Sequence, residues 1–168
     1  MDQNADLIRS FLPTSAANVA GIDPGVAVCV VDRDGRPLEV RDIDRIEKLC
    51  QVLSEFRDVV AVVADIRDRR DQIEWSAKAF DRGYRYGTAL GVCGAMKVPT
   101  LLSTAPRWEP VFGITSENGD CRCQAYVATV RSRLPELRLP ASAARAVLLA
   151  LYGVHMLKQI ESEKEKAN

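Results

Sequence analysis

Hydrophobic positions in the first quarter of the chain follow the pattern of strands separated by turns. The segment 18–31 is apolar and rich in β-branched residues, and Asp23-Pro24-Gly25 interrupts it, which indicates two strand halves around a bend. Asp32-Arg33-Asp34-Gly35 is a turn signal, after which residues 36–43 return as a further antiparallel strand. The chain is therefore expected to open with a hairpin or meander.

The next segments alternate between helical spacing and short buried runs. Apolar residues recur at helical spacing over 44–56, and 59–63 is a continuous apolar run that is typical of a buried strand. The later elements are predicted as a long helix over 75–96, a strand over 98–103, a short helix over 105–112 and helices over 121–134 and 142–160. This order predicts an α/β fold with a mixed five-stranded sheet flanked by helices, as in RNase H-like domains.

The long helix contains glycines near every fourth position, at Gly83, Gly87, Gly91 and Gly94. Each glycine costs a helix about 1 kcal/mol relative to alanine, so we expect something to pack closely against this face. The partner could be the protein's own sheet or the same helix of a second copy.

The chain length and composition fit one domain. A chain of 168 residues with 47% hydrophobic content can bury one core and leaves no room for a second catalytic domain. We expect a flexible N-terminal arm over 1–17, one folded domain over 18–160 and a charged C-terminal tail over 161–168 that forms a fraying helix end.

The formal net charge is zero, from 23 basic and 23 acidic residues, so any binding to nucleic acid must come from local basic patches. The five cysteines are odd in number and mostly lie in apolar runs, which indicates reduced thiols in an intracellular reducing compartment. Cys121 and Cys123 lack the partners of a zinc site, and His155 lies in an apolar helix. No apolar run reaches the ~20 residues needed to span a bilayer, so no membrane is expected, and localisation stays open.

Asp23 is the residue that most directly suggests chemistry. A carboxylate within a buried apolar strand is costly unless a cation or metal pairs with it. The simplest alternative is an Asp-Pro-Gly turn between two strands. A second alternative is the phosphate-binding loop of sugar-kinase and actin-type ATPases, which need two such lobes and a longer chain.

Several short motifs occur along the chain, and their order and spacing can be compared with those of known families. They are Gly21-Ile22-Asp23-Pro24-Gly25, the strand 59–63, the helical segment 84–91, the segments 98–99 and 104–108, and the apolar stretch 146–153. Together they resemble the RuvC-like Holliday-junction resolvases, particularly their phage and organellar branch, over roughly residues 19–153. The resemblance implies a homodimeric endonuclease that cuts four-way DNA junctions with two Mg²⁺ ions, with Asp23 among the metal ligands.

The chain departs from this family at the other acidic positions. The acid expected after the second buried strand falls at Ala64, and those expected at the last helix fall at Ala141 and Arg145. Asp65 is a poor substitute because neighbouring strand residues point to opposite faces. Since two metals need three or four converging carboxylates, the hypothesis is a junction-binding protein that does not cleave. Deliberate substitution of an active enzyme and natural degeneration into a non-catalytic binder would both leave these alanines.

Basic and aromatic residues follow the second buried strand. Candidate DNA-binding residues are Arg67, Arg69, Arg70, Lys78, Arg82 and Arg85, with Tyr84 and Tyr86 as base-stacking residues. The alternative is a solvated face of ion pairs with the interspersed aspartates. Trp108 is expected to be a packing residue, and Glu109 stands where relatives often carry a lysine that would contact phosphate. A remaining alternative function is an RNase H-like domain whose partner is RNA or another protein.

Overall fold

The structure, a computed structural model, describes residue 13 and residues 15–65, 77–115 and 122–167. It contains a five-stranded mixed sheet whose strand order is β3-β2-β1-β4-β5. The strands are β1 (Asn18–Asp23), β2 (Ala27–Asp32), β3 (Pro37–Asp42), β4 (Val59–Ala64) and β5 (Thr100–Ser103). The predicted α/β class and mixed five-stranded sheet are confirmed.

Strand pairing follows directly from the connections. The tight turns after β1 and β2 make both of these pairs antiparallel, whereas helical crossovers bring β4 and β5 in parallel to β1 and β4. In the first turn Gly25 has φ +70°, and in the second Asp32 accepts hydrogen bonds from the N–H groups of Asp34 and Arg36. The opening meander predicted from these turn residues is therefore present.

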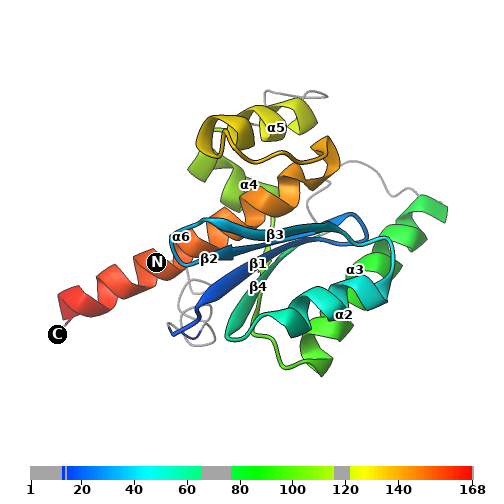
Figure 1. Ribbon diagram of the computed structural model, residues 1–168, viewed down its shortest axis with the longest axis horizontal. Helices are drawn as coiled ribbons and strands as arrows, with labels where there is room; N and C mark the ends of the chain where they lie inside the picture. Colours follow the sequence, from blue (N-terminus) through cyan, green and yellow to red (C-terminus); the bar gives the residue numbers. More distant parts are fainter. Residues whose placement is uncertain (1–12, 14, 66–76, 116–121, 168) are drawn as a thin grey trace.

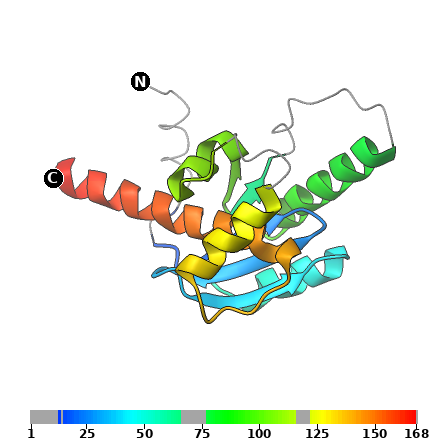
Figure 2. The ribbon, with the colours of Figure 1, turned by 90° about the horizontal axis from the view of Figure 1, so that it is seen from above.

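Helices cover both faces of the sheet (Figure 1). One face carries α6 (Ala144–Ala167), with α5 (Arg122–Arg133) and the short α4 (Ala105–Trp108) beyond it, and Figure 2 shows α6 crossing the strands beneath α5. The other face carries α2 (Ile46–Glu55) and α3 (Ala77–Ala95). The 3-10 turns η2 (Glu109–Phe112) and η4 (Ala141–Ala143) follow α4 and precede α6.

Two glycines let α6 approach the sheet closely. A Cβ on Gly21 of β1 would lie 2.0 Å from the carbonyl oxygen of Ala146, and one on Gly153 of α6 would lie 2.5 Å from Val19 Cγ1. Atoms at these distances overlap, so larger residues would push the helix away. The close approach fixes the beginning of α6 above the end of β1.

The glycines of α3 behave differently from the prediction. A Cβ added to Gly83, Gly87, Gly91 or Gly94 would meet nothing within 4 Å in the described part of the chain. Among the described residues the close packing predicted against these glycines is not found, because α3 contacts the sheet through its opposite side, where Ala89, Val92 and Cys93 are buried.

The structure describes part of each segment that the sequence placed outside the folded domain. Residues 1–12 of the predicted arm lie outside the described residues, but Ala16 is buried and the N–H of Ala17 donates to the carbonyl of Asp58. At the other end α6 continues to Ala167, so most of the predicted tail is helical, and Glu161 forms an ion pair with Arg33. Among the described helices none is long and apolar enough to cross a membrane.

Candidate functional site

The carboxyl ends of β1, β4 and β5 lie side by side. The parallel register places Ile22 beside Val63 and Ala64 beside Ser103, so Asp23 and Ala64 end neighbouring strands. Alternation along β1 turns Asp23 to the same face as Gly21, which is the face covered by α6. Ala64 belongs to the hydrophobic cluster on that same face. The structure therefore brings these two predicted site positions together.

Asp23 pairs with Arg145, the second residue of α6. The Arg145 Nη1 atom lies 3.4 Å from Asp23 Oδ1, and the side chains are 27% and 14% exposed. A cation is unfavourable at a helix N-terminus because the helix dipole is positive there. The negative charge of the Asp23 carboxylate offsets this unfavourable position of the Arg145 guanidinium. The cation that a largely buried Asp23 requires is thus supplied by the protein itself.

The other expected acidic positions do not contribute carboxylates. Ala64 is 2% exposed at the end of β4, and Ala141 is exposed at the first position of η4. Asp65 is also 2% exposed, and its N–H donates to the Ser103 carbonyl at 3.0 Å. This bond continues the strand pairing past Ala64, so alternation directs the Asp65 side chain away from the face of Asp23.

The residues present do not fit the two magnesium ions that the resemblance implies. Two divalent ions need several converging carboxylates, and no group of three or more His, Cys, Asp or Glu residues placed to hold a metal occurs among the described residues. Arg145 adds a fixed positive charge beside Asp23, which opposes metal binding electrostatically.

The burial of Glu109 has no signal in the sequence. Glu109 is 4% exposed and accepts a hydrogen bond from the hydroxyl of Tyr126. Burial, reinforced by the hydrogen bond to Glu109, raises the pKa of Tyr126 well above its usual range, and the charge of Arg145 lowers it in part. The resemblance placed Glu109 where relatives often carry a lysine that would contact phosphate, and in the structure the Glu109 side chain is buried. Trp108 is fully buried with its ring 5.2 Å from that of Tyr126, so its predicted packing role is confirmed.

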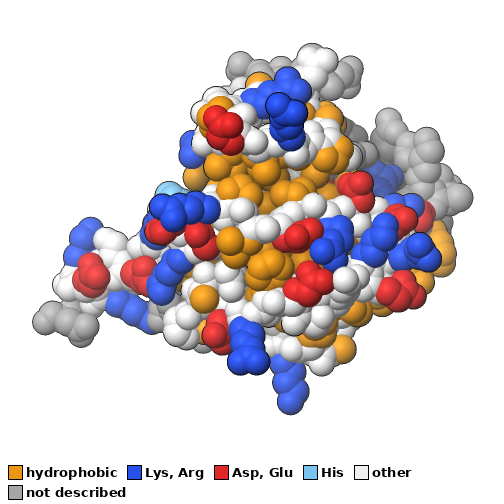
Figure 3. Space-filling model, viewed as in Figure 1, with side chains coloured by type: hydrophobic (Ala, Val, Ile, Leu, Met, Phe, Trp, Pro, Cys, Tyr) orange, Lys and Arg blue, Asp and Glu red, His pale blue; other side chains and the backbone are white. Residues whose placement is uncertain are grey.

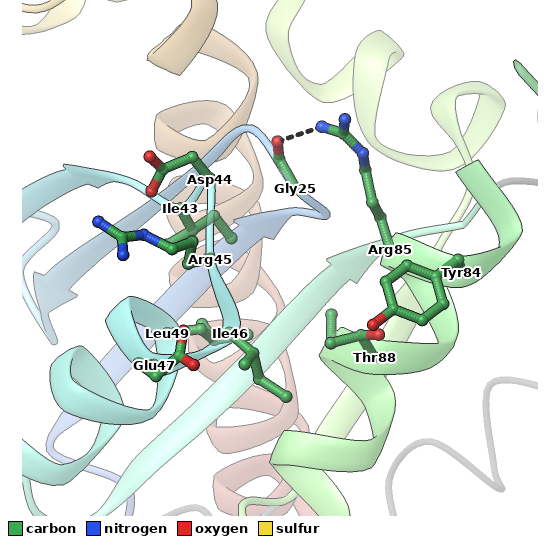
Figure 4. Close-up of a pocket in the computed structure, with 11 residues that line it drawn as sticks. Gly25, Ile43, Asp44, Arg45, Ile46, Glu47, Leu49, Tyr84, Arg85 and Thr88 are labelled. Atoms are coloured by element: carbon green, nitrogen blue, oxygen red, sulfur yellow. Dashed lines mark hydrogen bonds between the residues drawn. The ribbon is translucent and has the colours of Figure 1, made fainter. Parts of the chain in front are cut away.

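The N-terminal half of α3 lies against the turn between β1 and β2. Arg85 donates from Nη1 to the carbonyl oxygen of Gly25 at 2.8 Å and pairs through Nε with Asp81. Figure 4 shows Arg85 and Tyr84 on α3 opposite the residues that begin α2, around a pocket of about 310 Å³. The pocket lining carries charges of both signs, because it includes Asp44 and Glu47 as well as Arg45.

The other predicted DNA-binding residues are placed unevenly. Arg67, Arg69 and Arg70 lie outside the described residues, as does the side chain of Lys78. Tyr84 is 66% exposed, whereas Tyr86 packs against the core on the α3 side and Arg82 is half-buried. In Figure 3, basic and acidic side chains are intermixed over the visible face of the sheet and its helices. Of the two tyrosines predicted to stack on bases, Tyr84 is therefore the more exposed.

Comparison with known proteins identifies the fold. No protein-family model and no curated protein matches the sequence. The structure is similar to that of Thermus thermophilus RuvC in complex with a Holliday junction substrate, with a TM-score of 0.63 and 21% identity over 84% of this chain and 96% of that chain. A second Thermus thermophilus RuvC structure has a TM-score of 0.62 and 22% sequence identity, over 86% of this chain and 96% of that chain. This chain therefore has a RuvC-like fold.

Proposed function

We propose that this protein binds four-way DNA junctions as a homodimer and does not cleave them by two-metal hydrolysis. The fold supports the proposal of junction binding, because one solved structure with a similar fold is RuvC in complex with a Holliday junction substrate. The observation that carries the absence of cleavage is the pairing of Asp23 with Arg145, next to Ala64. A guanidinium stands where the proposed ancestral site needs a further carboxylate.

The C-terminal half of α3 is the proposed dimer contact. Gly87, Gly91 and Gly94 are exposed there, and small residues allow two helix backbones to approach closely. A four-way junction has approximate two-fold symmetry, which a two-fold symmetric dimer matches. Sedimentation velocity at rising protein concentration tests this contact, and a protein that stays monomeric throughout contradicts it.

The binding experiment compares an immobile four-way junction with a linear duplex of the same sequences and with an RNA hairpin, at one salt concentration. The proposal expects tight binding to the junction in the presence of excess duplex, and no nicking with Mg²⁺. Nicking by the unmodified chain would contradict the non-cleaving assignment. Equal affinity for junction and duplex would contradict the proposed preference for four-way junctions. A preference for the RNA hairpin would favour an RNA partner.

A restoration experiment tests the positions assigned to the missing acids. The variant carries Ala64→Glu, Ala141→Asp and Arg145→Asp, and it is expected to nick the junction with Mg²⁺ if these positions surround Asp23 in the bound state. The matched control adds Asp23→Asn to the same three changes and should be inactive. A triple variant that binds the junction without nicking it would show that these positions do not rebuild the site.

A further inference from the structure

Helix α5 and the segment after it carry an excess of basic side chains in a chain whose net charge is zero. Residues 122–139 contain four arginines and one glutamate, and α5 itself contains no acidic residue. Arg131 and Arg133 lie in the last turn of α5, Arg138 lies between α5 and η4, and all three are exposed. Figure 3 shows basic side chains on the lobe that α5 forms above the sheet. A local excess of this kind is what such a chain can offer to nucleic acid.

These three arginines are not neutralised by neighbouring acids in the described part of the chain. None of their side chains forms an ion pair or a hydrogen bond with another described residue. By contrast, Lys48 of α2 and Arg85 of α3 each form an ion pair with the aspartate four residues earlier. The guanidinium groups at the end of α5 therefore keep their charge and their N–H donors available for a partner.

Arg133 is oriented without using those donors. Its guanidinium carbon lies 4.9 Å from the centre of the Phe112 ring in η2. Stacking on an aromatic ring uses the face of the guanidinium, whereas the N–H groups point outward in its plane and match the oxygens of a phosphate. The ring contact restricts the side chain before an anion arrives, which lowers the entropy lost on binding.

The basic end of α5 lies at a distance from the Asp23–Arg145 pair. Helix α5 packs on α6, and its first residue, Arg122, acts together with Arg145 on Tyr126, whose pKa is raised by burial and lowered in part by these two cations. The 12 residues of α5 place its last residue roughly 16 Å from its first. That length corresponds to roughly five base pairs of DNA. A duplex arm that leaves the carboxyl ends of the strands over α5 would therefore reach its basic end.

A simpler explanation covers part of this arrangement. Arginines in the last turn of a helix are favoured by the negative end of the helix dipole. This accounts for Arg131 and Arg133 but not for Arg138, which lies outside α5. It also predicts that substitution lowers the free energy of unfolding and leaves the affinity for DNA unchanged. The two explanations are therefore separable by measurement.

We propose that Arg131, Arg133 and Arg138 form a phosphate-binding surface, the arm surface, which holds a duplex arm of the junction at a distance from the crossover. This inference rests on the proposed junction binding and deepens it, because it assigns the contact with an arm to the outer end of α5. The partner is the phosphate backbone of duplex DNA, and the contact depends on neither base sequence nor metal.

The test measures the affinity for a fluorescein-labelled immobile four-way junction and for a linear duplex, by fluorescence anisotropy in EDTA over a range of KCl concentrations. The variant carries Arg131→Gln, Arg133→Gln and Arg138→Gln. Each lost phosphate contact should lower the slope of log affinity against log salt by about one, so this variant should lose about two to three units for each bound subunit. Its affinity should fall about ten-fold or more at about 0.1 M KCl. Because the contact is with duplex, the slope should fall for both DNAs.

Two matched variants separate charge from position. Lysine at all three positions keeps the positive charge and should keep the slope. A second triple variant, with Arg36→Gln, Arg57→Gln and Lys97→Gln, removes three exposed cations at the opposite edge of the sheet and should leave the slope unchanged. Urea denaturation of each variant reports its folding. If the triple variant of the arm surface fails to fold, Arg138→Gln alone should lower the slope by about one.

The outcomes distinguish this inference from the proposed function. An unchanged slope in the glutamine variant overturns the inference, and so does a loss that the control variant matches or that is confined to the junction. A variant that only unfolds more easily, with unchanged DNA affinity, assigns these arginines to the helix dipole and also overturns it. Equal binding of junction and duplex by the unmodified protein overturns the proposed function instead, whereas a lowered slope for duplex would still support the arm surface.

Discussion

The two faces of the sheet use glycine in opposite ways. On the α6 face, Gly21 and Gly153 lie where the helix and the strands are in contact, and any side chain would overlap a neighbour. On the α3 face, Gly87 and Gly91 lie on the outer side of the helix, where an added Cβ meets nothing within 4 Å. The spacing of glycines along the sequence therefore does not tell whether a glycine allows two elements of the chain to pack closely or lies on an exposed helix surface.

The polar chemistry is divided in the same way. The α6 side holds two partly or fully buried pairs, Asp23 with Arg145 and Glu109 with Tyr126. The α3 side carries Arg85 over the first turn, together with an open pocket. Substitutions on the α6 side should therefore change stability, whereas those on α3 should change contacts with partners.

The strongest test of the contrast is Gly21→Ala. The added Cβ would lie 2.0 Å from the Ala146 carbonyl oxygen and 2.3 Å from the Ala150 nitrogen, both backbone atoms that cannot move alone. We expect a loss of about 3 kcal/mol or more in the free energy of unfolding, measured by urea denaturation. Gly87→Ala is the control, expected to unfold no more easily than the unmodified chain. A loss below about 1 kcal/mol for Gly21→Ala would mean that α6 is not held this closely.

The second test is Tyr126→Phe, which removes the hydroxyl that donates to Glu109. The buried carboxylate loses its partner, so the free energy of unfolding should fall by about 2 kcal/mol. Glu109→Gln keeps an acceptor for the hydroxyl and should cost less. If both variants unfold as the unmodified chain does, the pair does not stabilise this face.

The third test compares one thiol on each face. Burial, with a smaller effect from Glu39, raises the pKa of Cys29 to about 12, and burial raises the pKa of Cys93 against a hydrogen bond with Thr100. Because both folded pKa values are raised, the stabilising effect is complete below the unfolded value near 9 and is lost as the pH rises towards the folded value.

Each of the two thiols is expected to contribute a decrease of up to about 1.4 kcal/mol in the free energy of unfolding for each pH unit above about 9. Cys29→Ala should reduce this dependence more than Cys93→Ala does, measured by urea denaturation with reductant between about pH 8 and 11. An unchanged dependence in Cys29→Ala would argue against a buried, neutral thiol on the α6 face.

The smallest expected effect is that of Gly91→Ala. An alanine on this open helix face should raise the free energy of unfolding of the monomer by up to about 1 kcal/mol. The same methyl group should weaken self-association if α3 forms the proposed dimer contact, so sedimentation velocity is measured alongside denaturation. Destabilisation of the monomer would indicate that another part of the chain contacts this face.

The sequence predicted the elements better than it predicted their surroundings. The turn residues around Gly25 and Gly35 and the apolar run of β4 were sufficient for the sheet, since each is a local signal. The surroundings of Glu109 and of the α3 glycines depend on which distant segment lies opposite, which no local pattern specifies. The pairing of Arg145 with Asp23 has the same cause, because 122 residues separate them along the chain.

One helix also fixes a distance useful for measurement. The 24 residues of α6 extend from the turn that carries Arg145 to a charged end that projects beyond the sheet in Figure 1. At 1.5 Å per residue, a fluorophore on the last turn stands roughly 30 Å from Arg145. Energy transfer from that position to dyes on the junction arms would therefore report how the DNA is oriented while leaving the Asp23–Arg145 pair untouched.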